Sequence, residues 1–187
     1  MNLAFFGRFP VLSTPRLILR EPQTGDAAAL FAMRKDEEVN RYQLQDALPT
    51  VESARALIVR WRRRFTLKAD LRWIAVTRED GAFAGTCAYA YFIPGLDRGH
   101  LTYELARHAW GRGLATEAAQ AMVAFGHAEA GLNRIEAVVM PAHEASARVL
   151  RKTGFEEEGL LRAYGHWQGR FYDLRMFSIL RGAAGTK

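Results

Sequence analysis

A short glycine-containing turn carries the clearest chemical signal in this sequence. Gly111 and Gly113 flank Arg112, between an apolar strand-like segment and a helix-like segment. Glycine adopts backbone conformations closed to residues with a Cβ, so several N–H groups can converge on one point, which the positive end of the following helix dipole also faces. Such a turn binds an anion, most naturally a phosphate or diphosphate. The alternative is an ordinary glycine turn that leads into an amphipathic helix.

The spacing excludes two better-known phosphate-binding motifs. A lysine-bearing P-loop has a lysine directly after its last glycine, whereas Leu114 follows Gly113 here. The dinucleotide fingerprint requires a third glycine at the position that Thr116 occupies. The interpretation of this turn therefore depends on the rest of the chain.

Four ordered motifs, at residues 110–118, 133–136, 146–155 and 158–162, resemble the GNAT superfamily of acyl-CoA-dependent N-acetyltransferases. Within it they resemble the RimJ/RimL-type, ribosomal-protein-alanine acetyltransferase branch, and the resemblance runs from about residue 14 to 180. It implies an α/β (mixed α+β) fold with a mostly antiparallel twisted sheet of about seven strands and about four flanking helices. The fourth and fifth strands would splay apart into a V-shaped slot. It also implies direct transfer of the acetyl group of acetyl-CoA to a primary amine, with no covalent acyl-enzyme.

The resemblance also implies which residues bind the cofactor. The backbone N–H groups from Gly111 to Thr116 are the expected diphosphate donors, with Arg112 as the first side-chain candidate and Arg107 as the second. Either arginine could instead be an ordinary surface residue. The end of the preceding strand would pair with the pantetheine amides and supply an N–H group to the thioester oxyanion. The expected cofactor-binding residues are Leu105, Ala106, Arg107, Trp110, Gly111, Arg112, Gly113, Leu114, Ala115, Thr116, His143 and Ser146.

Two residues are the candidate catalytic groups. Glu104 is the first choice for the base that deprotonates the amine, directly or through water, ahead of His100 and His166. Ser146 matches a serine that some members of the branch place near the sulfur, where it would protonate the leaving thiolate. The alternatives are a solvated or ion-paired Glu104 and a Ser146 hydroxyl bonded back to its own helix. Many members use a tyrosine one turn further on, where this chain has Leu150.

The acceptor is left open by the sequence. Gly165 replaces the acidic residue of the ribosomal-protein members, which puts N-terminal-alanine activity in doubt. An α-amine with a pKa near 8 needs only about 1.4 kcal/mol to be neutral at pH 7, whereas a lysine needs roughly 4.6 kcal/mol, so a weakly assisted site favours a low-pKa amine. Two kinds of acceptor therefore remain as candidates: a protein N-terminus, and a small amine such as an amino acid, a polyamine or an aminoglycoside. The expected substrate-binding residues are Tyr42, His100, Tyr164, His166 and Trp167.

The elements that must position these residues follow from periodicity and turn signals. Expected strands cover residues 16–20, 73–77, 83–92, 100–105 and 135–139, with two final strands around 165–169 and 171–180. Expected helices cover 27–35, 50–65, 115–130 and 144–152. Four arginines between residues 60 and 64 mark either the solvated face of an amphipathic helix or a site for RNA or an acidic partner.

Composition sets the remaining limits. The 187 residues, 49% of them hydrophobic, suit a single domain over 1–187, with an N-terminal arm at 1–13 that packs irregularly or frays and a loose tail at 182–187. The single cysteine, Cys87, is expected to be buried and inert, no metal is expected, and no apolar run reaches the length of a membrane span. These features favour the cytoplasm.

The net charge of +6 favours polyanionic ligands or partners, such as coenzyme A or ribosomal RNA. We expect the protein to bind an amine acceptor, not to associate with a membrane, and to bind no nucleic acid except where it contacts the ribosome. We expect it to be either a monomer or a homodimer. The alternatives to the N-acetyltransferase interpretation are a small-molecule or antibiotic-detoxifying acetyltransferase of the same fold, or a weakly catalytic acyl-CoA-binding module associated with the ribosome or RNA.

Overall fold

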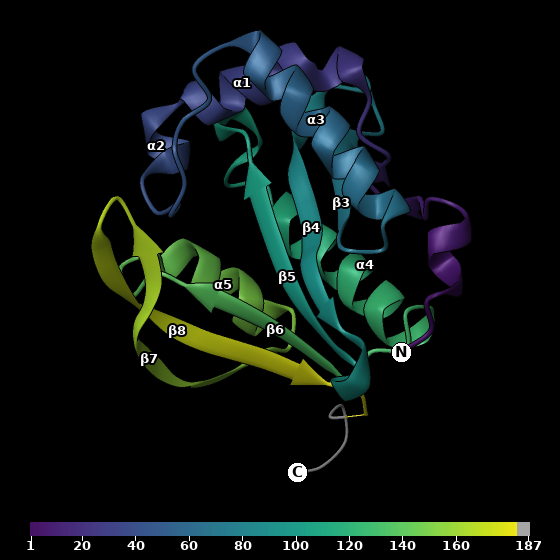
Figure 1. The fold of residues 1–187 in the computed structure, drawn as a ribbon, viewed down its shortest axis with the longest axis vertical. Helices are drawn as coiled ribbons and strands as arrows, with labels where there is room; N and C mark the ends of the chain where they lie inside the picture. The colour runs from purple at the N-terminus through teal and green to yellow at the C-terminus, as the bar shows by residue number, and fades with distance from the viewer. Residues whose placement is uncertain (183–187) are drawn as a thin grey trace.

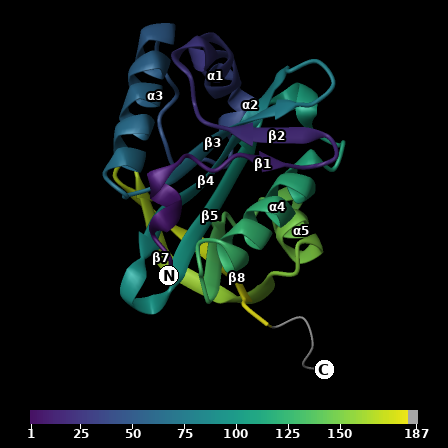
Figure 2. The ribbon, with the colours of Figure 1, turned by 90° about the vertical axis from the view of Figure 1, so that its right-hand side faces the viewer.

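The computed structural model describes residues 1–182, so residues 183–187 of the expected tail lie outside the described part. One twisted eight-stranded sheet, in the order β1-β2-β3-β4-β5-β6-β8-β7, runs through the molecule with helices on both faces (Figures 1 and 2). The strands are β1 (Leu12–Ser13), β2 (Leu17–Arg20), β3 (Leu71–Thr77), β4 (Phe83–Ile93), β5 (Arg98–Leu105), β6 (Arg134–Val139), β7 (Glu156–Trp167) and β8 (Arg170–Leu180). The helices are α1 (Ala27–Lys35), α2 (Glu37–Asn40), α3 (Val51–Thr66), α4 (Leu114–Ala128) and α5 (Glu144–Lys152).

The expected mixed α/β class is confirmed, with one more strand and one more helix than expected in the described residues. The additional strand, β1, has only two residues, too few to show an alternating pattern in the sequence. The additional helix, α2, is a single turn whose N-terminus is capped by Asp36, which accepts from the N–H groups of Glu38 and Val39. Short elements of this kind depend on their neighbours rather than on hydrophobic periodicity.

Two apolar clusters hold the helices on opposite faces of the sheet (Figure 2). On one face, α4 buries Ala118, Met122 and Phe125 against the central strands, and α5 adds Ala147 and Leu150. On the other face, α1 and α3 pack against each other and against β3 through residues spaced three and four apart, as expected for amphipathic helices. These residues include Leu30, Met33, Ala54, Ile58 and Trp61.

The N-terminal arm is packed rather than frayed. Phe6 is buried, and Phe5 and Phe9 pack on the larger apolar cluster. The arm is also tied by hydrogen bonds, because the indole of Trp73 donates to the carbonyl of Pro10 over 2.8 Å and the amide of Asn2 donates to Ala130 over 2.8 Å. The arm therefore contributes to the core of the domain.

The sheet splits in its middle, as the resemblance implied. β5 and β6 are parallel and pair over three residues, Arg98–His100 against Arg134–Glu136. Beyond that point β5 stays with β4 while β6 continues along β8, so the two strands diverge in Figure 1. The divergence opens a V whose arms are the N-terminal and C-terminal halves of the sheet.

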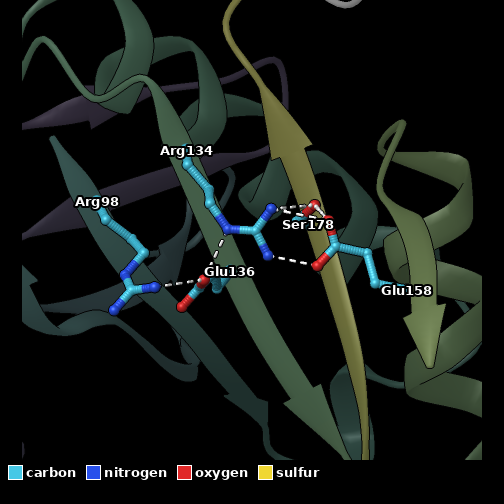
Figure 3. Close-up of polar contacts among 5 residues, drawn as sticks. All are labelled: Arg98, Arg134, Glu136, Glu158 and Ser178. Carbon is cyan, nitrogen blue, oxygen red and sulfur yellow. Dashed lines mark hydrogen bonds and ion pairs between the residues drawn. The ribbon is translucent and has the colours of Figure 1, made fainter. Parts of the chain in front are cut away.

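A charged network lies at the apex of this V (Figure 3). The buried carboxylate of Glu136 accepts from Nε of Arg134 over 2.6 Å and from Nη1 of Arg98 over 3.3 Å. Arg134 also donates to Glu158 on β7 and to Ser178 on β8, over 2.7 and 3.1 Å. The hydrogen bond from Arg134 lowers the pKa of Glu158 to about 2. The network therefore ties β5, β6, β8 and β7 together where the V closes.

Candidate active site

The divergence of β5 and β6 leaves a cleft of about 610 Å³ between the two halves of the sheet. Four parts of the chain line it: the glycine turn with the start of α4, the end of β5, the start of α5, and the region around α2. Its lining includes many of the expected residues, namely Tyr42, Glu104, Leu105, Trp110, Gly111, Gly113, Leu114, Ala115, Thr116, His143 and Ser146. The arrangement brings the anion-binding turn and both candidate catalytic groups to one cavity.

The glycine turn has the backbone geometry that its sequence predicts. Gly111 and Gly113 have φ angles of +72° and +76°, in the left-handed region where other residues are strained. Gly113 is the N-cap of α4, so the amides that follow it face the cleft without intrahelical partners. Free amides at the positive end of a helix dipole favour a bound phosphate group.

A polar clamp fixes the turn to the N-terminal strands. Glu117 in the first turn of α4 accepts from the hydroxyl of Thr14 over 2.5 Å and from the backbone amide of Arg16 over 2.8 Å. The Arg16 guanidinium bonds the same carboxylate through Nε over 2.7 Å and donates through Nη1 to the carbonyl of Arg112 over 2.8 Å. Burial of Glu117 would raise its pKa, but these hydrogen bonds outweigh it and lower the pKa. The clamp thereby holds the turn and the first turn of α4 against the N-terminal strands.

Neither arginine that we expected to reach a phosphate lines the cleft. Arg112 instead lines a separate cavity of about 280 Å³ together with Arg16 and Arg78. Arg107 lies in a short 3-10 helix after β5 and is exposed. The basic side chains that line the cleft are Arg41, near α2, and Arg148 and Lys152 of α5. We did not expect the α5 pair from the sequence, although its spacing of four residues places both on one helix face.

The free edge of β5 presents its backbone to the cleft. The amide of Ala106 donates to the carbonyl of Ala84 over 2.9 Å, which directs this residue toward β4 and leaves its side chain buried outside the cleft. Because backbone groups alternate along a strand, the amides of Tyr103 and Leu105 point the other way, to the open edge. The carbonyl of Leu105 accepts from the indole of Trp110 over 2.8 Å, so the Leu105 amide is the group at this position that is directed into the cleft.

Sequence reasoning missed Tyr103, which meets Ser146 across the cleft. The Tyr103 hydroxyl lies 3.0 Å from Oγ of Ser146 and donates to the Ser146 carbonyl over 3.2 Å. The Ser146 hydroxyl thus has a cross-cleft partner, in contrast to the expected alternative of a bond back to its own helix. Burial raises the pKa of Tyr103 well above its usual range, so the phenol stays protonated at neutral pH. Alternation along β5, which puts Tyr103 on the face opposite Glu104, was the signal available in the sequence.

Glu104 is an ion-paired carboxylate at the other side of the cleft. Oε2 lies 2.8 Å from Nε of Arg34 in α1, and Oε1 accepts from Nε2 of Gln45 over 3.0 Å. The side chains of Arg34 and Glu104 are only 6% and 13% exposed. The structure therefore places the candidate base in the cleft with both oxygens already in contact with neighbours.

The two histidines near the cleft are both uncharged at neutral pH. His143 stacks on Tyr42, with ring centroids 4.5 Å apart, and burial lowers the pKa of His143. His100 is buried where β5 pairs with β6 and stacks on Tyr91 with ring centroids 4.9 Å apart, and burial lowers its pKa to about 4. Of these two, His143 lines the cleft and His100 does not.

The remaining expected substrate-binding residues lie outside the cleft lining, on the β7–β8 hairpin. Tyr164 and His166 are exposed, and the His166 ring packs on Phe171 with centroids 4.7 Å apart. The indole of Trp167 donates to Asp46 over 3.3 Å, which connects the hairpin to the segment after α2. Their contribution to substrate binding stays a prediction.

Other expected features concern residues outside the cleft. Cys87 lies fully buried in β4, and burial raises the pKa of its thiol to about 12, so it is not a nucleophile at neutral pH. Two of the basic residues of α3 are in ion pairs, Arg62 with Glu21 and Arg64 with Asp70. Between residues 1 and 182 there is no group of three acidic, histidine or cysteine side chains arranged to hold a metal, and no helix there is apolar and long enough to cross a bilayer.

Comparison with known proteins gives one consistent result. The acetyltransferase (GNAT) domain family matches residues 16–156. The uncharacterized N-acetyltransferase YoaA of Bacillus subtilis is 35% identical over 173 residues, 92% of this chain and 98% of the relative. The uncharacterized N-acetyltransferase p20 of Bacillus licheniformis is 34% identical over 171 residues, 91% of this chain and 96% of the relative.

A solved structure supports the same fold. RimJ of Mycobacterium smegmatis, in complex with CoA-disulfide, superposes with a TM-score of 0.87 at 24% identity, covering 97% of this chain and 92% of RimJ. The family match, the two relatives and the split sheet agree with the resemblance drawn from the sequence motifs. The chain therefore belongs to the GNAT family of acetyltransferases.

Proposed function

We propose that this acetyltransferase uses acetyl-CoA to acetylate the nitrogen of a primary amine. The observation that carries the proposal is that one cleft contains the glycine turn at the start of α4, the Tyr103–Ser146 pair and Glu104. The complexes of RimJ with CoA-disulfide and of the microcin C7 self-immunity acetyltransferase MccE with acetyl-CoA and AMP support the choice of acyl donor.

The residues of the cleft fit coenzyme A in charge and in hydrogen-bonding capacity. The amides from Gly111 to Thr116 would hold the diphosphate, and Arg148 and Lys152 add positive charge on the facing helix. The free edge of β5 at Tyr103 and Leu105 offers the backbone groups that the pantetheine amides require. When bound, acetyl-CoA supplies an acetyl group activated as a thioester.

Three groups of the chain would then serve the transfer. The Leu105 N–H, directed to the open edge of β5, donates a hydrogen bond to the developing oxyanion. The Ser146 hydroxyl would donate a proton to the leaving sulfur and regain one from solvent, and the Tyr103 hydroxyl 3.0 Å away positions it. Both hydroxyls are protonated at neutral pH, so they act as donors without prior titration.

Glu104 would act on the amine. Its carboxylate attracts the acceptor ammonium, and the proton leaves the amine to this carboxylate through water, because Arg34 and Gln45 already contact its two oxygens. Because both oxygens of Glu104 already have contacts, the site gives little help in removing the amine proton, and a low-pKa amine suits it better than a lysine side chain. At pH 7 deprotonation costs about 1.4 kcal/mol for an α-amine and roughly 4.6 kcal/mol for a lysine side chain, and this difference is large enough to favour the α-amine.

The test separates binding from turnover. Isothermal titration calorimetry with coenzyme A is expected to show binding to the wild type and to the Glu104→Gln and Ser146→Ala variants alike. Thiol release from acetyl-CoA over a panel of primary amines is expected in the wild type and is expected to fall in both variants. A wild-type protein without affinity for coenzyme A would overturn the proposal.

A further inference from the structure

We propose that the segment from Tyr42 to Asp46, here called the strap, closes the acceptor side of the cleft and restricts the enzyme to small primary amines. Within the strap, the packing of Leu44 against Gly165 is the contact that determines specificity for acceptor size. The inference rests on the proposed function, because it names the acceptor class of the same site. The contacts of the strap join the two arms of the V.

The strap contacts two residues that line the cleft and also the β7–β8 hairpin outside it. Tyr42 stacks on His143 at the start of α5, and Gln45 donates to Glu104 on β5. Asp46 accepts from the Trp167 indole over 3.3 Å and from the Gln168 side-chain amide over 3.0 Å. In Figure 1 the segment that follows α2 accordingly reaches toward the tip of the β7–β8 hairpin. The strap thus bridges the two arms of the sheet.

Leu44 occupies the space that the missing side chain of Gly165 leaves. A Cβ atom at Gly165 would lie 2.4 Å from Cδ1 of Leu44 and 3.4 Å from Cδ1 of Leu174, so alanine and Leu44 cannot both occupy the site as it stands. The φ angle of Gly165 is not in the left-handed region, so space and not backbone strain requires glycine here.

The strap also covers the group that would receive the acceptor. Glu104 is only 13% exposed, because Gln45 of the strap contacts one oxygen and Arg34 contacts the other. A small amine needs only the space next to this carboxylate. A protein N-terminus brings a polypeptide chain that must pass between the strap and the hairpin, and this requires the contacts of Leu44 and Asp46 to open. Acceptor size is therefore the property that these two residues select.

The first experiment compares acceptors of two sizes. Wild type, Leu44→Ala and Asp46→Ala are assayed with glycinamide and other small primary amines, and with a decapeptide that begins with glycine. We expect the wild type to favour the small amines, and we expect both variants to shift the kcat/KM ratio toward the decapeptide by roughly tenfold. Leu160→Ala is the matched control, since Leu160 is a half-exposed leucine on β7, and it should leave the ratio unchanged.

The second experiment measures the strap itself by hydrogen exchange of residues 42–48. We expect faster exchange in Leu44→Ala and in Gly165→Ala, and no further increase when Gly165→Ala is added to Leu44→Ala, because the leucine that it would displace is already gone. An unchanged kcat/KM ratio, unchanged exchange, or a wild type that favours the decapeptide would overturn the inference while leaving the proposed function intact. Absence of amine-dependent thiol release from the wild type and every variant would overturn the proposed function, and the inference with it.

Discussion

The hydroxyl of Tyr103 lies 3.0 Å from Oγ of Ser146, so a side chain from β5 meets one from α5 across the cleft. The two residues are far apart in the sequence and come from the two arms of the split sheet. Their contact places two protonated hydroxyls at the side of the cleft where our proposed mechanism puts the leaving sulfur.

Tyr103→Phe is expected to lower kcat by roughly tenfold to a hundredfold, because it removes the hydroxyl that positions Ser146 but leaves the proton donor itself, which is worth roughly a hundredfold to ten-thousandfold. Coenzyme A affinity by calorimetry should be unchanged, since the ring remains. If the two hydroxyls act as a unit, Tyr103→Phe combined with Ser146→Ala should cost little more than Ser146→Ala alone. Tyr89→Phe is the matched control, because its hydroxyl donates to the Met122 carbonyl inside the core, and it should cost stability without lowering kcat.

Gly111→Ala is expected to weaken coenzyme A binding through backbone strain alone. A Cβ at Gly111 meets no atom within 4 Å, so only the φ angle of +72° opposes the substitution, at a cost of about 1 kcal/mol. Gly81→Ala is the control, because its φ angle of +68° and its open surroundings are similar but it lies in the β3–β4 turn. Both variants should lose similar stability in urea unfolding, and equal loss of cofactor affinity in both would contradict the prediction.

Acid is expected to destabilise the fold through His100. Burial lowers its folded-state pKa from 6.5 to about 4, although the nearby Glu136 opposes this shift. The unfolded chain therefore takes up a proton on this histidine below pH 6.5, whereas the folded chain does so only near pH 4. The stabilisation from the uncharged His100 is complete above pH 6.5 and is lost as the pH falls toward 4. By pH 5 the loss in the free energy of unfolding is about 2 kcal/mol.

His100→Phe, which retains a ring against Tyr91, isolates this contribution. The free energy of unfolding in urea, measured at pH 7 and at pH 5, should fall less in the variant than in the wild type. Carboxylates elsewhere contribute equally to both proteins, so the comparison cancels them. Equal losses in the two proteins would show that His100 does not carry the effect.

Glu136→Ala is expected to destabilise the apex of the V by about 3 kcal/mol, because it leaves Arg98 and Arg134 without their buried partner. Glu158→Ala removes a more exposed partner of the same Arg134 and should cost no more than about 1 kcal/mol. Urea unfolding of the two variants checks the order. A larger loss for Glu158→Ala would mean that the buried carboxylate is not the centre of the network.

The elements with local signals were predictable from the sequence. The glycine turn and the start of the helix after it were placed to within a residue, because Gly111 and Gly113 are needed for their positive φ angles whatever surrounds them. The resemblance also placed the split between the strands that became β5 and β6. The strand β1 and the helix α2 were missed because two and four residues show no periodicity.

The contacts within the site were less predictable because they join distant parts of the chain. The direction of Arg112, away from the cleft, is set by the arrangement of the turn against Arg16 and the β3–β4 turn. Similarly, nothing local to Gly165 shows that Leu44 occupies the space above it. The sequence marked Gly165 as unusual for its family, but only the folded chain supplies the leucine that explains it.

The burial of Cys87 has a practical consequence for work on the strap. Because the single cysteine of the chain sits inside β4 with a pKa raised to about 12, maleimide reagents at neutral pH have no reactive thiolate to modify in the folded protein. A cysteine introduced on the strap and labelled with a fluorophore would thus report its position in an otherwise native sequence. Opening and closing could then be followed in solution, one molecule at a time.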